Sequence, residues 1–309
     1  MTQIAIVGTE GSGKTTLASV WAKYMQTRTS GNVFLAPTGW NTREYVNSVY
    51  TMLQGGGWWR STEAGRQFEL EWTLTVDKRK VLVKLIDSAG QDLRSLITGD
   101  AYKNTRNSSL RKLLDYIQKS DILVLVVNLR DFLDEPDGNR RWRNSAILQE
   151  VIGFSRHRHI AVVFTAWDCY HPVVEDEFGT FQNYLERALP ELYISIRSGR
   201  SNGNIIDIFP VAAVDTEIET LDGTPFRVPR KNFTSYGIDT LSDWILKAEK
   251  EIADRKTKAI GAFVCAGCGA FIGTGLGWFF GGGVSAGIGC LIGVVIGLIG
   301  AVITIQHNT

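Results

Sequence analysis

The segment Gly8–Thr15 constrains the fold of this chain more than any other, because it fits the phosphate-binding P-loop pattern G-x-x-x-x-G-K-[ST]. The apolar run at residues 3–7 is typical of a short buried strand, and residues 16–25 have the spacing of an amphipathic helix. Glycines let such a loop curl so that its N–H groups face phosphate oxygens, and the helix adds the positive end of its dipole. A chance glycine-rich turn would not require strand, loop and helix in this order.

Each position of this loop has an expected part in holding a nucleotide. Lys14 can reach the β- and γ-phosphates, where it would also act in catalysis, and the Thr15 hydroxyl can bind Mg²⁺. The other loop positions that we expect at the phosphates are Glu10, Gly11, Ser12, Gly13 and Thr16.

Charged residues are distributed very unevenly along the chain. Of 309 residues, 33 are basic and 32 acidic, and this balance argues against a general nucleic-acid binder. Residues 259–309 contain no Asp, Glu, Lys or Arg. We therefore expect a nucleotide-binding domain over residues 1–256 and a separate segment over residues 257–309.

Strand and helix patterns alternate through the first domain. We expect further strands at 32–37, 68–76, 81–86, 122–127, 160–164 and 205–211, and helices at 41–53, 94–119, 142–154, 178–195 and 238–254. Residues 215–235 are predicted to form a polar loop or hairpin, and His157 and His159 to lie at the surface. This order predicts a doubly wound, mostly parallel α/β sheet with nucleotide at the carboxyl ends of its strands.

A second motif, which follows a predicted β-hairpin, resembles one found in Ras-like P-loop GTPases. It reads Asp87-Ser88-Ala89-Gly90 and is followed by Gln91. The resemblance implies that Asp87 holds Mg²⁺ through water, that the Gly90 N–H senses the γ-phosphate, and that Gln91 orients the attacking water. An ordinary turn after a strand, capped by aspartate, is the alternative.

The same resemblance implies a switch threonine, at the Mg²⁺ ion and the γ-phosphate, just before the strand that precedes this motif. We assign this metal-binding and catalytic role to Thr62 and treat residues 30–57 as an insertion. Ser61 and Thr38 remain open, and a helix N-cap is the plain alternative for such a threonine. Arg60 could stabilise transition-state charge, although most loop arginines are solvated.

A third motif, Thr165-Ala166-Trp167-Asp168, resembles the guanine-recognition sequence [NT]-K-x-D of the same GTPases, with Ala166 in place of the lysine. Asp168 can accept hydrogen bonds from the ring N–H and the exocyclic amine of guanine, a pair that adenine does not offer. The missing lysine weakens this assignment, and Trp167 could compensate by stacking. The alternative is that Asp168 caps the following helix. The family's Ser-Ala pair after the next strand is matched here only by Ala213, whose N–H would lie near the guanine oxygen.

The uncharged tail is predicted to form a transmembrane helical hairpin. Ala259–Phe280 and Val284–Ile305 are each 22 residues long, and at about 1.5 Å per residue either could cross about 30 Å of hydrocarbon. Small residues at every fourth position would let helices touch closely in lipid and self-associate. They are Gly261, Cys265, Gly269, Gly273, Gly277, Gly281, Ser285, Gly289, Gly293, Gly297 and Ala301. The alternatives are a buried hairpin of a soluble protein and, for Cys265 with Cys268, half of a zinc site.

We therefore expect a membrane-anchored GTPase that hydrolyses GTP to GDP with Mg²⁺ and acts as a nucleotide-dependent switch. Basic residues before the tail predict that the GTPase domain faces the cytoplasm, at a bacterial inner membrane. No cleavable signal peptide is expected ahead of the first strand. An alternative is a nucleotide-gated effector whose hairpins oligomerise and permeabilise the membrane. A third reading, a module that holds nucleotide only for structure, is disfavoured by Lys14, Asp87 and Gln91 together.

The stretch Gly56–Trp58 and the motif at residues 165–168 also loosely resemble GTPases of bacterial conflict and antiphage systems. This similarity implies a role in bacterial defence. It extends over about residues 1–250, with specific motifs only at the P-loop, at residues 87–91 and at residues 165–168.

Overall fold

The computed structural model describes residues 2–9, 11–28, 33–59, 68–76, 78–87, 115–133, 139–154 and 159–257. The chain divides into two compact units, Met1–Ala248 and Glu249–Thr309. The first unit contains the P-loop and the sheet, and it is the unit in which the candidate site lies.

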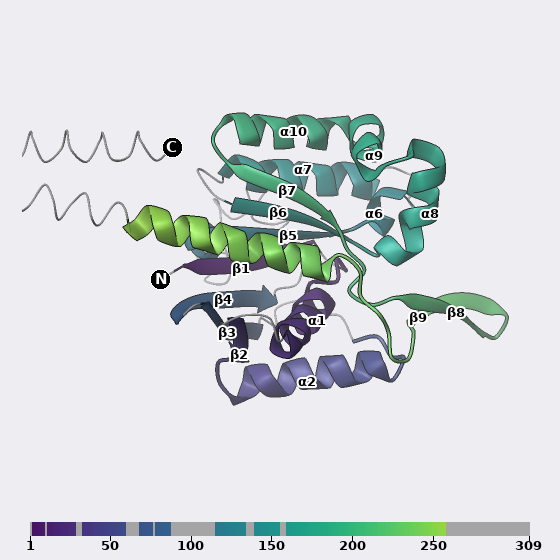
Figure 1. Ribbon diagram of the computed structural model, residues 1–309. Helices are drawn as coiled ribbons and strands as arrows, with labels where there is room; N and C mark the ends of the chain where they lie inside the picture. The colour runs from purple at the N-terminus through teal and green to yellow at the C-terminus, as the bar shows by residue number, and fades with distance from the viewer. Residues whose placement is uncertain are drawn as a thin grey trace, which may run out of the picture. The chain divides into compact units, whose positions relative to one another are not determined.

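Seven strands form one mixed sheet in the order β2-β3-β4-β1-β5-β6-β7 (Figure 1). Their bounds are β1 Gln3–Gly8, β2 Val33–Pro37, β3 Phe68–Val76, β4 Arg79–Asp87, β5 Ile122–Asn128, β6 His159–Thr165 and β7 Ile205–Pro210. β4, β1, β5, β6 and β7 run parallel, whereas β3 is antiparallel to both of its neighbours. The predicted α/β fold with a mostly parallel sheet is confirmed.

Helices cover both faces of this sheet. The helices are α1 Lys14–Thr27, α2 Trp40–Gln54, α6 Arg130–Leu133, α7 Asn139–Phe154, α8 Trp167–Phe178, α9 Phe181–Ala188 and α10 Pro190–Ser201, with further helical residues at 115–119 and 238–257. On one face, Ile152 of α7 and Ile196 of α10 join an apolar cluster with Leu125 and Val162 of the central strands. On the other face, Nε1 of Trp21 in α1 donates to Oγ of Ser242, 3.0 Å away in the helix of residues 238–257. The strands β5 and β6 are therefore covered on both sides, which explains their continuous apolar sequences.

The single helix predicted for residues 178–195 is wrong. α8 ends at Phe178, where that helix was expected to begin, and the following residues form α9 and then α10. Thr180 ends the run because its Oγ1 accepts the N–H of Asn183, 3.1 Å away, and so caps α9. Pro190 then starts α10 at a position where a missing N–H costs nothing.

The expected exposure of His159 is also wrong. This histidine is the first residue of β6 and is only 3% exposed. Its ring packs edge-on against Trp244, with 6.2 Å between the ring centroids. Because Trp244 belongs to a helix 85 residues further along the chain, local sequence around His159 could not predict this cover.

The segment at residues 215–235 contains the hairpin that the sequence suggests. β8 (Thr216–Leu221) and β9 (Thr224–Pro229) form a separate two-stranded sheet that extends away from the main sheet on the right of Figure 1. The Nε1 of Trp58, just after α2, donates to the Arg227 carbonyl of β9 at 2.8 Å. The hairpin is thus connected to the end of α2 as well as to β7.

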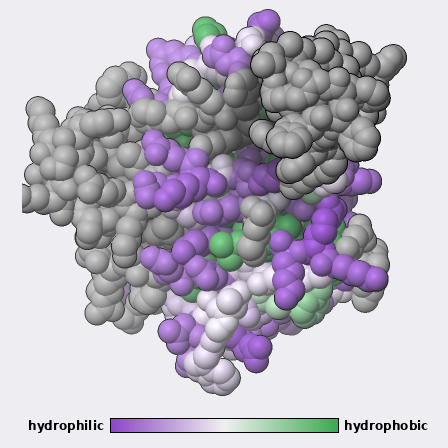
Figure 2. Space-filling model, turned by 90° about the vertical axis from the view of Figure 1, so that its left-hand side faces the viewer, coloured by the Kyte–Doolittle hydropathy of each residue, from purple (hydrophilic) through white to green (hydrophobic). Residues whose placement is uncertain are grey.

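Among the described residues, no helix is both long and apolar enough to cross a bilayer. The predicted spans Ala259–Phe280 and Val284–Ile305 lie outside those residues. Figure 2 views the left side of Figure 1, where β1 begins. The described residues visible there are mainly hydrophilic.

Candidate functional site

The P-loop connects the end of β1 to the start of α1, as predicted. Gly13 sits in the left-handed region with φ of 78°, directly before the first helical residue, Lys14. Residues with a Cβ rarely adopt this conformation. A Cβ at Gly8 would lie 2.1 Å from the Val126 carbonyl oxygen of β5, so the first glycine of the motif allows the close packing of β1 on β5. Both glycines are therefore required by the backbone path.

Lys14 and Thr15 begin α1 at the carboxyl end of β1. The Nζ of Lys14 donates to the Thr9 carbonyl at 2.9 Å, so the lysine side chain folds back over the loop, and the residue is only 7% exposed. The α1 N-terminus has no acidic residue in its first turn and no side-chain cap. Its N–H groups and the ammonium group together make this end of the helix strongly attractive to an anion.

The loop also contains two buried hydroxyl groups for which the described residues provide no hydrogen-bond partner. They are Oγ1 of Thr9 and Oγ of Ser12, and Ser12 is fully buried. Leaving a buried hydroxyl unpaired costs about 1–3 kcal/mol. A phosphate oxygen is an acceptor that such a hydroxyl can bind, so these groups fit an anionic ligand at the loop.

Side chains at the ends of β5 and β6 brace the loop. Oγ1 of Thr165 lies 2.8 Å from the Ser12 carbonyl and 3.1 Å from that of Val127. Nδ2 of Asn128 donates to the Gly11 carbonyl at 3.1 Å. Thr165 therefore contacts the loop backbone, whereas Asn128 is a site residue that the sequence reasoning missed. Asn128 is the one polar residue of β5 and ends this otherwise apolar strand, and this position could have identified it from the sequence.

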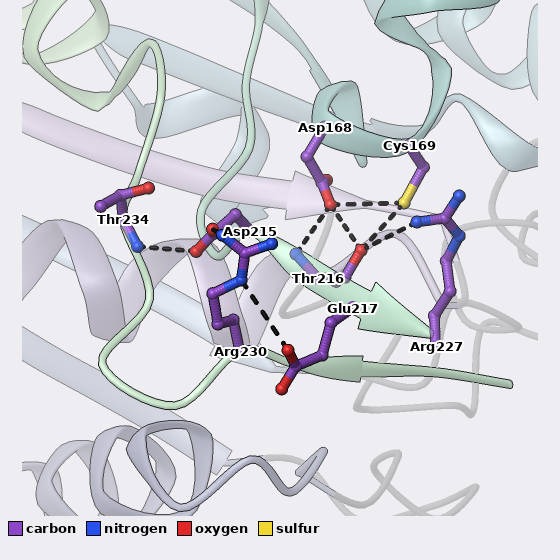
Figure 3. A network of polar contacts seen from close by, with 8 residues as sticks. All are labelled: Asp168, Cys169, Asp215, Thr216, Glu217, Arg227, Arg230 and Thr234. Carbon is purple, nitrogen blue, oxygen red and sulfur yellow. Dashed lines mark hydrogen bonds and ion pairs between the residues drawn. The ribbon is translucent and has the colours of Figure 1, made fainter. Parts of the chain in front are cut away.

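Asp168, three residues after Thr165, is bound to the β8–β9 hairpin (Figure 3). Its Oδ2 accepts the Thr216 N–H at 3.0 Å, the Thr216 hydroxyl at 2.6 Å and the Cys169 thiol at 3.4 Å. α8 begins after Ala166 and has no side-chain cap. The alternative that Asp168 caps this helix is therefore wrong, because its carboxylate binds a strand 48 residues away instead.

The idea that Trp167 stacks on a base is also wrong. Trp167 is 7% exposed and belongs to the apolar core, where its ring packs edge-on against Phe181, with His171 edge-on at the rim. Ala166, in the position of the family's lysine, has a φ of 63°, which is uncommon for a residue with a Cβ. This conformation turns the chain so that Trp167 enters the core and Asp168 faces the hairpin.

Ala213 lies just beyond the end of β7. The neighbouring Ala212 pairs with Tyr236 through two backbone hydrogen bonds, of 3.1 and 2.8 Å. The Trp167 N–H contacts the Val211 carbonyl at 3.3 Å, so the chain after β7 runs beside the start of α8. Ala213 is thus close in the fold to the segment that contains Asp168, and it is 7% exposed.

The strand predicted at residues 81–86, which leads to the motif at residues 87–91, is confirmed as β4. β1 and β4 are parallel with Ile6 opposite Leu85, so Gly8 and Asp87 end their strands at the same level. Thr38 follows β2, three strands from β1 and thus about 14 Å away at the usual strand spacing. Its hydroxyl lies 3.3 Å from that of Thr73. The separation of about 14 Å between β2 and β1 disfavours Thr38 as a ligand at the P-loop.

Several predicted site residues lie outside the described part of the chain. They are Glu10, Arg60, Ser61, Thr62, Gly90 and Gln91, together with the side chain of Asp87. Their assigned roles stay predictions. Within the described residues, no group of three or more His, Cys, Asp or Glu is arranged to hold a metal ion.

Burial sets the ionisation of the thiol next to Asp168. Desolvation raises the pKa of Cys169 above its ordinary value, against the opposing effect of its hydrogen bond to Thr216. The sulfur therefore keeps its proton at neutral pH and places no second negative charge beside the Asp168 carboxylate.

Comparisons with known proteins return only weak likenesses. No protein-family model matches the chain, and no curated protein matches it. Roco2 RocCORdC of Methanosarcina barkeri, bound to GDP, matches with a TM-score of 0.36 and 12% identity, over 80% of this chain but only 48% of that one. An ADP-ribosylation factor-like GTP-binding protein of Encephalitozoon cuniculi, the small COPII coat GTPase in complex with GDP, matches with a TM-score of 0.35 and 13% identity over 69% of each chain. At these values the likeness carries no argument, and function has to be judged from the site itself.

Proposed function

We propose that this chain is a Mg²⁺-dependent GTPase that hydrolyses GTP to GDP and changes state with its nucleotide. The observation that carries the proposal is the joining of two motifs at one edge of the sheet. Thr165 of the Thr-Ala-Trp-Asp motif is hydrogen bonded to Ser12 of the P-loop. This contact supports our assignment of the P-loop and the Asp168 carboxylate to one nucleotide site.

The loop residues supply the phosphate chemistry. The ammonium group of Lys14 and the N–H groups at the start of α1 would stabilise negative charge as water attacks the γ-phosphorus and GDP leaves. Gln91 would orient that water, and the Gly90 N–H would respond to the γ-phosphate. Lys14 is already held at the loop by Thr9.

The expected donors suit Mg²⁺, which prefers oxygen ligands. They are the Thr15 hydroxyl at the start of α1, the Asp87 carboxylate at the end of β4, and Thr62. When bound, the ion would neutralise charge on the β- and γ-phosphates. The strand before the P-loop, β1, is the parallel neighbour of β4, which ends at Asp87, and this pairing supports the assignment.

Asp168 would give the site its preference for guanine. A carboxylate accepts the two N–H donors of guanine but meets an acceptor and no matching donor pair on adenine. Sites that depend on such hydrogen bonds discriminate strongly. Ala213, near the same segment, would offer its N–H to the guanine oxygen.

A second candidate function concerns the tail, and one feature of the sequence favours it. Residues 259–309 lack charge and carry small residues at every fourth position. We propose that they anchor the protein in a membrane as a two-helix hairpin, with the GTPase domain in the cytoplasm at a bacterial inner membrane. Assembly of these hairpins into a permeabilising oligomer is the alternative activity. Bacterial defence is the setting implied by the motif resemblance.

Release of phosphate from GTP tests the proposed enzyme directly. The full chain, purified in detergent, is assayed with Mg²⁺ and with excess EDTA, beside Lys14→Ala and the control Lys23→Ala. Lys23 is on the same helix, but its ammonium group contacts Asn47 and the Tyr50 ring instead of the loop. We expect Lys14→Ala to reduce turnover by about 100-fold or more and Lys23→Ala to leave it nearly unchanged. Equal, Mg²⁺-independent turnover by all three proteins would contradict the proposal.

A further inference from the structure

We propose that Thr216 is a positioning residue for base recognition, which holds the carboxylate of Asp168 in the orientation that binds guanine. The inference rests on the proposed function, since it concerns the same site. The sequence alone did not indicate this role, because Thr216 belongs to a segment that was predicted only as a polar loop or hairpin.

Thr216 directs both of its donors to a single oxygen. Its N–H and its hydroxyl lie 3.0 and 2.6 Å from Oδ2 of Asp168, respectively (Figure 3). Two donors from one residue fix the rotation of the carboxylate more firmly than one flexible contact would. Within the described residues, no hydrogen bond to the second oxygen, Oδ1, accompanies them, so that atom keeps its accepting capacity for a ligand.

Thr216 is itself held in place by its own hairpin. Its Oγ1 accepts a hydrogen bond from Nη1 of Arg227, 3.2 Å away on the paired strand β9. Because Oγ1 accepts from a cation on one side, it is a better donor to Asp168 on the other. The hydroxyl hydrogen is therefore directed at the carboxylate.

The residue before Thr216 is also fixed. Oδ1 of Asp215 accepts the Thr234 N–H at 2.7 Å, and Oδ2 of Asp215 lies 3.2 Å from Nη1 of Arg230 (Figure 3). Nε of Arg230 lies 3.9 Å from Glu217 on the other side of Thr216. Contacts of Asp215 and Glu217 thus fix the backbone on both sides of Thr216. A residue that positions another side chain needs such a fixed backbone.

The proposed base recognition needs this support because, among the described residues, Asp168 has no other strongly bound partner. It is half-buried at the start of α8, where an aspartate side chain could rotate toward water or toward the helix N–H groups. The remaining contact to the carboxylate is the thiol of Cys169 at 3.4 Å, a weak donor. Without Thr216, the carboxylate would present its oxygens in several orientations, and a base with two matched donors would lose the most.

The test measures GDP and ADP affinities for the full chain and three variants. Thr216→Val keeps the shape and the N–H but removes the hydroxyl, and Thr216→Ser restores it. Thr220→Val is the matched control, because Thr220 is on the same strand and face and is exposed. We expect Thr216→Val to weaken GDP binding about tenfold and ADP binding by less than twofold. Thr216→Ser and Thr220→Val should stay within threefold of the wild-type protein for both nucleotides.

Each other outcome identifies what has failed. Unchanged or tighter GDP binding in Thr216→Val would overturn the inference, the tighter case showing that Thr216 competes with the base. Equal losses for GDP and ADP, with a lower unfolding temperature, would also overturn it, in favour of a purely structural hairpin. If the wild-type protein itself does not prefer GDP over ADP, the proposed function fails and the inference fails with it.

Discussion

Two polar residues that are three positions apart, Thr165 and Asp168, have different tasks at the end of β6. Thr165 contacts the P-loop through the Ser12 carbonyl, whereas Asp168 contacts the hairpin through Thr216. The first contact braces the backbone of the P-loop, which we propose binds phosphate whatever the base. The second supports the carboxylate assigned to the base. Substitutions at Thr165 and at Thr216 should therefore have different effects, the first on the binding of any nucleotide and the second on the preference for guanine.

Replacing Thr165 with valine should weaken the binding of all nucleotides by similar factors. The change leaves the buried Ser12 carbonyl without its hydroxyl partner, which costs about 1–2 kcal/mol of unfolding free energy and loosens the loop. We expect GDP and ADP affinities to fall by similar factors, as measured by calorimetry, while Thr220→Val changes neither. A selective loss of GDP binding would show that Thr165 acts on the base.

At the scale of elements, the β8–β9 hairpin links two parts of the chain that the sheet keeps apart. One end of this link is Asp168 after β6, and the other is Trp58 after α2, whose Nε1 donates to Arg227. Arg227 in turn donates to Thr216. The segment next to Trp58 leads into the predicted switch residue Thr62. The hairpin therefore connects the segment that contains Asp168 with the end of α2.

Removing the indole donor should loosen the hairpin without unfolding the protein. In Trp58→Phe the Arg227 carbonyl loses a partner at 2.8 Å on a half-exposed site, at a cost of about 0.5–1 kcal/mol. We expect faster hydrogen exchange in residues 224–229 and a small loss of GDP affinity. Trp40→Phe is the control, because Trp40 is 71% exposed. Equal exchange in both variants would mean that the Trp58 contact does not stabilise the hairpin.

At the scale of the whole molecule, much of the first unit could be predicted because its signals are local. The P-loop, the apolar strands and the position of Asp87 follow from short stretches of sequence. Three other features could not be predicted from local sequence: the burial of His159, the core position of Trp167 and the contact between Asp168 and Thr216. Each depends on residues that are distant in the chain or on an unusual backbone angle. Thr216 was hidden for the same reason.

The tail gives the whole chain a second, separable prediction. Full-length protein added to dye-loaded liposomes should associate with the vesicles in either account of the tail. A simple anchor should release no dye with GTP or GDP, whereas a gated effector should release it in one nucleotide state only. Lys14→Ala should abolish any such nucleotide dependence. Failure to float with the vesicles would contradict both membrane proposals and leave the GTPase proposal intact.

The central claim, a guanine site built on Asp168, is tested most directly by nucleotide binding to the full chain and to Asp168→Asn. GDP, ADP and xanthosine diphosphate are titrated with Mg²⁺ present. The account predicts that the wild-type protein binds GDP at least about tenfold more tightly than ADP. In Asp168→Asn the amide oxygen can still accept from Thr216, while the amide N–H₂ can donate to the extra carbonyl of xanthine. GDP affinity should then fall and xanthosine diphosphate affinity should rise. Equal binding of GDP and ADP, unchanged by the substitution, would contradict the account and leave a P-loop site without base selection.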